Sequence, residues 1–392
     1  MRKNIVNSEP TFLLIIILLG FPQLHEALFA PSLQHVMQTF LVSANHAQNS
    51  ISIYFAAFAC GVLFWGTYSD AHGRRPAMLY GFLIYLVGAI LAFFAPNFVL
   101  FLLGRAILAF GIATASVTTQ TILREAFSPQ VRNKLFSKVS IGLAFVPALG
   151  PVLGGLIVDH YTLHSLLGVL LAMGISVIVL AYIKLPETRI QANASKIRAN
   201  VVFKRLVKTP TVWIYGFFIA VMNAVMSCYY AEAPIILQAY FNRSLTEIGS
   251  YSIFFAIATI LGALLTQKLL NYIKPERIIL IGNIIFGIGS VTMVYATQSP
   301  SILYYLGGMV IVRFGTAIAL SNAISLALNG FEDVYGTAGS LFSLGYYLCI
   351  SLLVRIMATL HNGSMLLMPS YFVILALALI SLSIYTLKMK TH

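Results

Sequence analysis

Apolar runs of about 20 residues recur along the whole chain and are separated by short polar connections. A helix of about 20 residues rises about 30 Å, which matches the hydrocarbon core of a bilayer. The pattern therefore predicts an all-α membrane protein with twelve transmembrane helices. We place these spans at residues 11–33, 49–68, 76–95, 97–123, 136–158, 164–185, 211–237, 247–270, 277–298, 301–328, 335–360 and 366–387.

Basic residues are distributed unevenly between the connections. If the N-terminus lies inside, the inner segments hold 20 of the 24 lysines and arginines, the outer loops hold only Arg243, and three arginines lie within spans. By the positive-inside rule, this bias places both termini in the cytoplasm. We expect a multi-pass protein of the inner (cytoplasmic) membrane that acts as a monomer.

The composition agrees with a membrane location. Hydrophobic residues make up 59% of the chain and charged residues 9%, whereas a soluble domain is nearer half apolar and a quarter charged. The net charge of +13 follows from the topology, so we expect the basic residues to meet anionic lipid headgroups and not nucleic acid. Cys60, Cys228 and Cys349 all lie in apolar runs, which predicts no disulfide framework, no metal site and no cofactor.

The longest inner connection divides the chain into two halves of six spans. This connection, residues 186–210, holds six basic residues and one acidic residue. A polar linker midway through an even number of spans predicts two similar helical bundles, here residues 1–185 and 211–392. Weak internal likeness supports the repeat, because Glu26 is followed by Glu232 after 206 residues and Arg105 by Arg313 after 208.

Charged residues within the spans are the main candidates for function, because an ionisable group in mid-membrane usually faces a cavity or a partner. Glu26 lies about 10 Å from the outer end of span 1 and Arg105 about 12 Å from the outer end of span 4. Their equal depth indicates either a proton-coupling pair or a static ion pair. His25 is expected to pack, since adjacent helical residues point about 100° apart. The first run has no small-residue cleavage site, so we interpret it as a retained helix.

The second half offers a less regular set of charges. Glu232 lies about 8 Å from the outer end of its span and Arg313 about 18 Å, so the two are not level. Arg355, about 8 Å deep in span 11, is therefore the expected partner of Glu232. We assign proton coupling to Glu26, Arg105 and Glu232.

Aromatic residues near these charges are candidates for substrate contact. The chain holds 27 Phe and 20 Tyr, most of which are expected to pack or to sit at the membrane interfaces. Tyr54 in span 2 and the segment CYYAEAP at 228–234, with Tyr229 and Tyr230, have the character of a cavity wall for apolar ligands, including cationic ones. With Glu26 they form our predicted substrate-binding set.

One short inner loop is dense in charge. The stretch GTYSDAHGRR joins spans 2 and 3 and carries Gly66, Asp70, Gly73, Arg74 and Arg75. Its spacing resembles the loop motif of the major facilitator superfamily, Gly-x-x-x-Asp-x-x-Gly-Arg-Arg/Lys. The resemblance implies that the loop acts as a gate, with Asp70 at the N-terminus of span 11 when the inner side is shut. The alternative is that the arginines only set topology and contact lipid phosphates.

The loop arginines could form ion pairs with acidic residues at the inner ends of neighbouring spans. Near the neighbouring inner ends we identify Glu125, Glu332 and Asp333 as the only such acids. In the loop itself, Gly66 would let two helices approach closely and Gly73 suits a tight turn.

Span 5 carries a second match. Its small residues and prolines, Gly142, Pro147, Gly150, Pro151, Gly154 and Gly155, resemble the antiporter motif of the superfamily's drug/proton exporters. Interior prolines kink a helix, and small residues permit close contact between helices. We therefore expect span 5 to be a gating helix between the halves, and the alternative is ordinary helix packing. The segment LPETR at 185–189 is similar to the same place in Bcr/CflA-type exporters, whereas Leu108 and Ala109 depart from the superfamily's span-4 motif.

Taken together, the resemblance implies a secondary active transporter that exports small amphipathic compounds or drugs in exchange for protons by alternating access. The alternative is a major facilitator importer or exporter of one metabolite. An enzyme is not expected, because the chain holds no His-Glu-x-x-His, no paired intramembrane aspartates and no suitable Gly-x-Ser-x-Gly. A channel is not expected either, because no re-entrant segment interrupts the spans.

Overall fold

The structure is a computed structural model that describes residues 10–126, 145–146, 149–189, 199–298, 300–331 and 334–389. Within these residues, eleven helices are long and apolar enough to cross a membrane. They coincide with eleven of the twelve predicted spans to within a few residues at most ends. At the place of the twelfth, the described residues hold a shorter apolar helix, Leu149–His160, because residues 136–144 and 147–148 of the predicted span 136–158 lie outside them.

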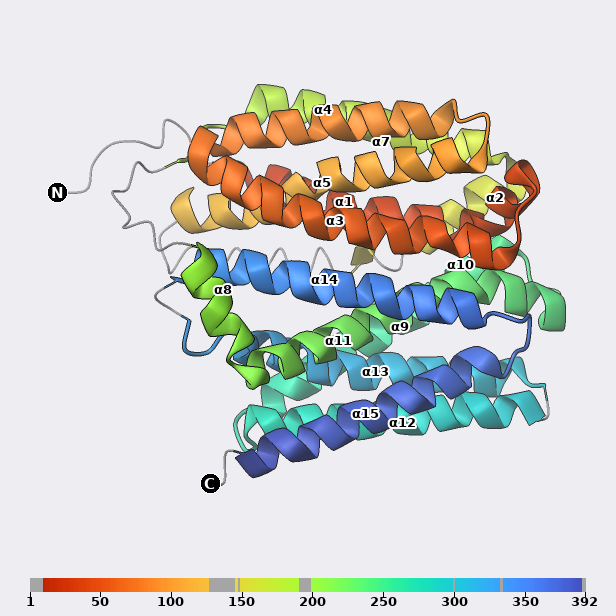
Figure 1. The fold of residues 1–392 in the computed structure, drawn as a ribbon. Coiled ribbons are helices and arrows are strands. Elements are labelled where there is room, and N and C mark those ends of the chain that lie inside the picture. Colours follow the sequence, from red (N-terminus) through yellow and green to blue (C-terminus); the bar gives the residue numbers. More distant parts are fainter. Residues whose placement is uncertain are drawn as a thin grey trace. The chain divides into compact units, whose positions relative to one another are not determined.

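The chain splits into two compact units, Met1–Ile197 and Arg198–His392, and the boundary falls inside the segment 186–210. Figure 1 shows the long helices of each unit lying side by side. In order, the helices of unit 1 are α1 (Phe12–Phe29), η1 (Ala30–Ser32), α2 (Leu33–Phe40), α3 (Ala44–His72), α4 (Arg74–Phe93), α5 (Phe98–Ala126), Leu149–His160 and α7 (Leu163–Lys184).

The helices of unit 2 include one that lies within the predicted linker. In order, they are α8 (Ala199–Val207), α9 (Pro210–Phe241), α10 (Leu245–Ser250), α11 (Ser252–Leu269), α12 (Pro275–Gln298), α13 (Ile302–Ala327), α14 (Tyr335–Leu360) and α15 (Leu367–Met389). The additional helix, α8, is amphipathic and buries Val202 and Leu206. It is held to unit 2 by Arg205, which donates to the carbonyl of Gly330 and lies 4.7 Å from the Phe331 ring.

The first transmembrane segment is longer than predicted. After Phe29 the chain tightens into η1 at Pro31 and continues as α2 to Phe40. The Ser32 hydroxyl donates to the Phe29 carbonyl at 2.7 Å, a bond within the turn that joins α1 to α2. The end of the apolar run near residue 33 therefore does not end the helix.

Glycines bring paired helices into backbone contact in both units. A side-chain carbon on Gly88 of α4 would lie 2.3 Å from the backbone nitrogen of Leu108 in α5, so only glycine fits. In unit 2, a side-chain carbon on Gly289 of α12 would lie 2.6 Å from the carbonyl oxygen of Gly308 in α13. The same kind of helix pairing thus occurs in both units.

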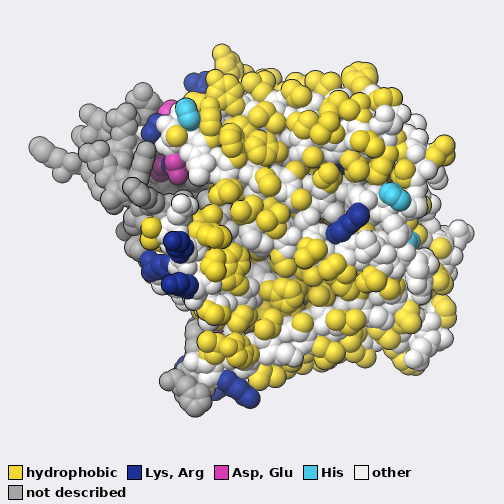
Figure 2. All heavy atoms as spheres, in the orientation of Figure 1, with side chains coloured by type: hydrophobic (Ala, Val, Ile, Leu, Met, Phe, Trp, Pro, Cys, Tyr) yellow, Lys and Arg dark blue, Asp and Glu magenta, His cyan; other side chains and the backbone are white. Residues whose placement is uncertain are grey.

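The surface matches a lipid environment. Apolar side chains cover most of the face shown in Figure 2, and the few lysines and arginines on it lie mainly toward one end of the helices. Large apolar residues such as Leu103, Val179 and Val291 are about half exposed. In a bilayer these side chains contact lipid tails, so their exposure carries no cost.

Candidate functional site

Glu26 and Arg105 form an ion pair inside unit 1. Arg105 Nη2 donates to Glu26 Oε2 at 2.7 Å, and these side chains are 0% and 15% exposed, respectively. Glu26 projects from α1, and Arg105 projects from α5. The pairing that the equal depth predicted is therefore present, and the Glu26 side chain is slightly exposed whereas the Arg105 side chain is fully buried.

Aromatic rings complete the environment of this pair. The Arg105 guanidinium carbon lies 3.7 Å from the centre of the Phe29 ring and 5.0 Å from that of Tyr54. These ring faces attract the cation without accepting its hydrogen bonds. Arg105 Nε and Nη1, and Glu26 Oε1, are buried without a hydrogen-bond partner among the described residues. The pair is thus held by one hydrogen bond and has unused donors and an unused acceptor.

Tyr54 and His25 line this site from α3 and α1. Tyr54 is 2% exposed, and its hydroxyl donates to the Pro22 carbonyl at 3.2 Å. The His25 ring stacks on the Tyr54 ring with centroids 6.0 Å apart and contacts Tyr85 edge-on at 5.5 Å. His25 therefore packs, as the sequence predicted, and Tyr54 orients α1 next to Glu26.

The helix Leu149–His160 contacts α1 directly beside Glu26. A side-chain carbon on Gly150 would lie 2.2 Å from the Ala27 side chain, and one on Gly154 would lie 2.2 Å from the Leu28 carbonyl. The glycines of the span 5 motif thus permit a backbone contact next to the ion pair. Pro151 and Gly155 are also described and are buried, whereas Gly142 and Pro147 lie outside the described residues.

Glu232 has a partner that the sequence analysis missed. Its Oε2 lies 2.8 Å from Nδ1 of His361, the residue after α14, and its own side chain is 2% exposed. The prediction that Arg355 pairs with Glu232 is wrong, because Arg355 is exposed on α14 and the histidine takes that place. The hydrogen bond to Glu232 raises the pKa of His361 above its usual value, against the opposing effect of burial.

The two tyrosines of α9 differ in access. Tyr229 is 1% exposed and packs edge-on against Phe255 with ring centroids 5.0 Å apart. Tyr230 is half-buried and keeps part of its ring accessible. Of the two side chains, that of Tyr230 is the more accessible.

The loop between α3 and α4 forms a compact charge cluster. Arg74 is 5% exposed, and it donates to Asp70 Oδ1 at 2.6 Å and to the two Glu125 oxygens at 2.6 and 2.9 Å. Gly73 has φ of 107°, a conformation that favours glycine, as expected for the tight turn. The Gly66 carbonyl accepts the Ser69 hydroxyl within α3.

Glu187, in the LPETR segment, belongs to this cluster and was missed. It accepts the backbone N–H groups of Arg74 and Arg75 at 2.9 and 3.1 Å, so a distant carboxylate caps the start of α4. The expectation that Glu125, Glu332 and Asp333 are the only nearby acids is therefore wrong. Glu187 directly follows span 6 on the same side of the membrane, and that position was a usable signal.

Parts of the predicted gate lie outside the described residues, namely Glu332 and Asp333. The Asp70 side chain is 71% exposed and pairs with Arg74, while its docking on span 11 stays a prediction. Arg75 donates to the Tyr182 carbonyl at 2.8 Å, which attaches the loop to α7. In the described parts of the chain, no group of three or more His, Cys, Asp or Glu residues could hold a metal ion.

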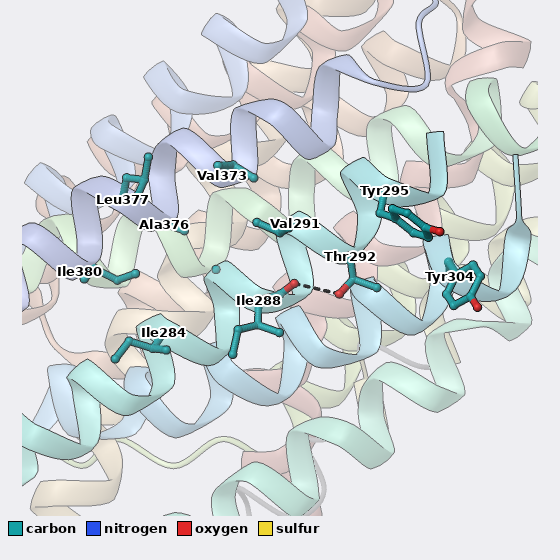
Figure 3. A pocket seen from close by; sticks show the side chains of 11 residues that line it. Ile284, Ile288, Val291, Thr292, Tyr295, Tyr304, Val373, Ala376, Leu377 and Ile380 are labelled. Atoms are coloured by element: carbon teal, nitrogen blue, oxygen red, sulfur yellow. Dashed lines mark hydrogen bonds between the residues drawn. The ribbon is translucent and has the colours of Figure 1, made fainter. Parts of the chain in front are cut away.

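An apolar groove of about 630 Å³ lies on unit 2 between α12 and α15. Figure 3 shows its walls, including Ile288, Val291, Tyr295 and Leu377, with the Thr292 hydroxyl bonded back to the Ile288 carbonyl at 2.9 Å. No charged side chain lines it, and Tyr295 and Val291 are more than half exposed. Such a groove suits lipid chains, so the charged pairs are the better candidate site.

Comparisons with known proteins identify relatives that cover most of the chain. An "Uncharacterized transporter" of Rickettsia bellii (strain RML369-C) is 27% identical over 374 residues, which cover 92% of each chain. "Multidrug resistance protein MdtL" of Escherichia coli (strain SMS-3-5 / SECEC) is 25% identical over 326 residues, with 82% of each chain covered.

Solved structures show the fold. The D-xylose-proton symporter matches with a TM-score of 0.73 at 14% identity, covering 94% of this chain and 96% of its own. The inward-open xylose transporter XylE from E. coli matches with a TM-score of 0.70, also at 14% identity and with 94% of each chain covered. The family model "Major Facilitator Superfamily" matches residues 15–354. The chain therefore belongs to the Major Facilitator Superfamily and is a secondary transporter, not an enzyme.

Proposed function

We propose that this transporter exports small amphipathic compounds, including drugs, in exchange for protons by alternating access. The observation that carries the proposal is the ion pair between Glu26 and Arg105, at 2.7 Å within transmembrane helices. A carboxylate inside a membrane protein is costly unless it has a partner or a function. Here the partner is present, and one oxygen of Glu26 still lacks a hydrogen bond among the described residues.

Two opposing influences make such a carboxylate suitable for proton exchange. Loss of water favours the neutral carboxyl group, whereas the neighbouring arginine favours the carboxylate. A change in water access or the arrival of a substrate shifts this balance, so that binding of proton and substrate compete. Because Gly150 and Gly154 contact α1, a movement of α1 that accompanies proton or substrate binding would also move span 5.

Export in exchange for protons is supported by the glycine-rich contact of span 5 and by the likeness to MdtL. The basic bias supports an inner-membrane protein with both termini in the cytoplasm. The second candidate is transport of one metabolite, and the fold shared with a xylose–proton symporter supports it.

Transport in proteoliposomes with an imposed pH gradient tests the proposal. The panel should hold amphipathic cations, neutral amphipathic compounds, organic acids and sugars. We expect several amphipathic compounds to accumulate against their gradients, and the accumulation to end when an ionophore collapses the pH gradient. Uphill movement of a single metabolite would favour the second candidate, and accumulation that survives the ionophore would exclude proton coupling.

A further inference from the structure

Arg313 is an arginine inside the membrane without a matching acid. It lies in α13, and its Nη2 donates to the Thr259 hydroxyl of α11 at 3.1 Å. In the portion of the chain that the structure describes, no aspartate or glutamate forms an ion pair with it. Its Nε is buried and has no hydrogen-bond partner there either.

The contrast with Arg105 shows what is missing. Arg105, at the matching place of the first half, is fully buried, pairs with Glu26 and lies between aromatic rings. Arg313 instead has one neutral hydroxyl as its partner. This hydroxyl accepts a hydrogen bond from one of the five N–H donors of Arg313 and does not offset its positive charge. A charge inside the membrane without an opposite charge is unfavourable, so an anion that is not part of these contacts would stabilise it.

The surroundings of Arg313 are polar and partly open. Its side chain is half-buried, and so are those of Thr259 and of Tyr230, which lies near enough to influence the charge of Arg313. On α9, Ser227 and Asn223 lie one and two turns before Tyr230, respectively, on the same side of the helix, with Asn223 exposed. A polar, accessible stripe in mid-membrane fits a water-filled cavity better than lipid contact.

We propose that Arg313 binds the anionic group of a transported compound, a carboxylate, sulfonate or phosphonate on an apolar body. This inference rests on the proposed function for the transport itself, and it adds organic anions to the substrate classes. The planar guanidinium presents N–H donors in a fork that fits two oxygens of such a group. Tyr230 supplies an aromatic surface for the apolar body beside it.

Equilibrium dialysis against the protein in lipid nanodiscs tests the proposal. Two probes share one aromatic skeleton, the anionic anilinonaphthalene sulfonate and the neutral N-phenylnaphthylamine, and protein-free nanodiscs give the background. The variants are Arg313→Gln, Arg313→Lys and, as a matched control, Arg355→Gln, which removes an exposed arginine of the same unit.

We expect the wild type to bind the sulfonate saturably and Arg313→Gln to bind it at least about tenfold more weakly, which corresponds to about 1.4 kcal/mol. Binding of the neutral probe should be unchanged, which also shows that the variant is folded. The affinity of Arg313→Lys for the sulfonate should be intermediate, because lysine keeps the positive charge but lacks the forked N–H donors of the guanidinium. The affinity of Arg355→Gln should equal that of the wild type.

Two results would overturn the inference. One is equal binding of the sulfonate by the wild type and Arg313→Gln, including the case in which neither binds it. The other is an equal loss for both probes, which would make Arg313 a structural residue held by Thr259. The binding measurement uses no pH gradient, so a failure of proton-driven transport would not contradict anion binding by Arg313. Conversely, a failure of anion binding would not contradict proton-driven transport of neutral compounds.

Discussion

Glu232 and His361 lie 2.8 Å apart, between Oε2 and Nδ1, and they join the interior of α9 to the residue that follows α14. Glu232 stands two residues before Pro234, where the helix lacks one backbone hydrogen bond. The contact therefore stabilises α9 at the turn that lacks this backbone hydrogen bond. It also places an ionisable imidazole at one end of unit 2.

The stabilisation by this pair should depend on pH. Because the hydrogen bond to Glu232 raises the pKa of His361, the contribution is fully present below the unfolded value of about 6.5 and is lost as pH rises through the higher folded value. His361→Asn should lower the apparent Tm most at acidic pH, by an amount corresponding to about 1.5–3 kcal/mol, and progressively less at alkaline pH. Thermal unfolding in detergent between pH 5 and 9 measures this.

Titratable groups near the pair must be considered in that experiment. They are Cys228 on the same helix, Tyr305 on α13, Tyr371 on α15, and Tyr240, whose hydroxyl bonds to the Gly363 carbonyl at 3.4 Å. Their thiol and phenol groups do not titrate near pH 6.5 in model compounds. His46→Asn, at an exposed end of α3, is the control. A destabilisation by His361→Asn that is constant over the pH range would contradict the assignment.

Glu187 should stabilise unit 1 as a remote cap of α4. Glu187→Ala removes the acceptor for the backbone N–H groups of Arg74 and Arg75, so we expect a loss of about 0.5–2 kcal/mol in unfolding free energy. Urea-induced unfolding in mixed micelles is the measurement. Asp70→Asn, which changes a largely exposed carboxylate, should cost less. If the two variants are equally stable, capping by Glu187 is not significant.

Gly154 should be intolerant of any side chain. In Gly154→Ala the added carbon would meet the Leu28 carbonyl at 2.2 Å, so α1 or the helix Leu149–His160 must move. We expect transport to fall several-fold, because the displaced turn carries Glu26. In the control Gly168→Ala, the added carbon meets the Phe93 ring at an ordinary 3.5 Å, and its transport should equal that of the wild type. Full activity of Gly154→Ala would show that this contact is not used in transport.

The orientation of the chain can be tested by labelling single cysteines in a cysteine-free background. Asn45 and Asn362 should react with a membrane-impermeant maleimide added from outside intact cells. Asn271, an exposed residue next to the basic residues Lys268 and Lys274, should react only after permeabilisation. The reverse labelling pattern would place the termini outside.

Hydropathy was sufficient to predict eleven of the spans, because crossing a bilayer depends on length and apolar content and needs no knowledge of packing. The Glu26–Arg105 contact was predictable for a related reason, since depth in the membrane can be counted along each helix. The direction in which a side chain points around its helix axis cannot be read from nearly uniform apolar runs. The assignment of Arg355 to Glu232 failed on this point.

Contacts made beyond the helix ends were harder to predict. His361 lies just after α14, and Glu187 lies in an extended segment after α7, so neither belongs to a periodic pattern. Their partners are fixed by how the helices pack and by the path of the connections. The extension of the first segment to Phe40 was missed because polar residues in α2 resemble a loop, although its Leu33 and Val36 are buried.

Proton coupling through Glu26 is tested most directly by comparing two modes of transport in Glu26→Gln. Substrate counterflow at equal pH on both sides needs binding and alternating access, whereas uphill transport driven by a pH gradient also needs a group that releases a proton. We predict that Glu26→Gln retains counterflow of a neutral substrate and loses uphill transport, with Glu232→Gln and the double variant measured alongside. Uphill transport by Glu26→Gln with the wild-type pH dependence would contradict the role of Glu26, and the same result in the double variant would exclude both carboxylates.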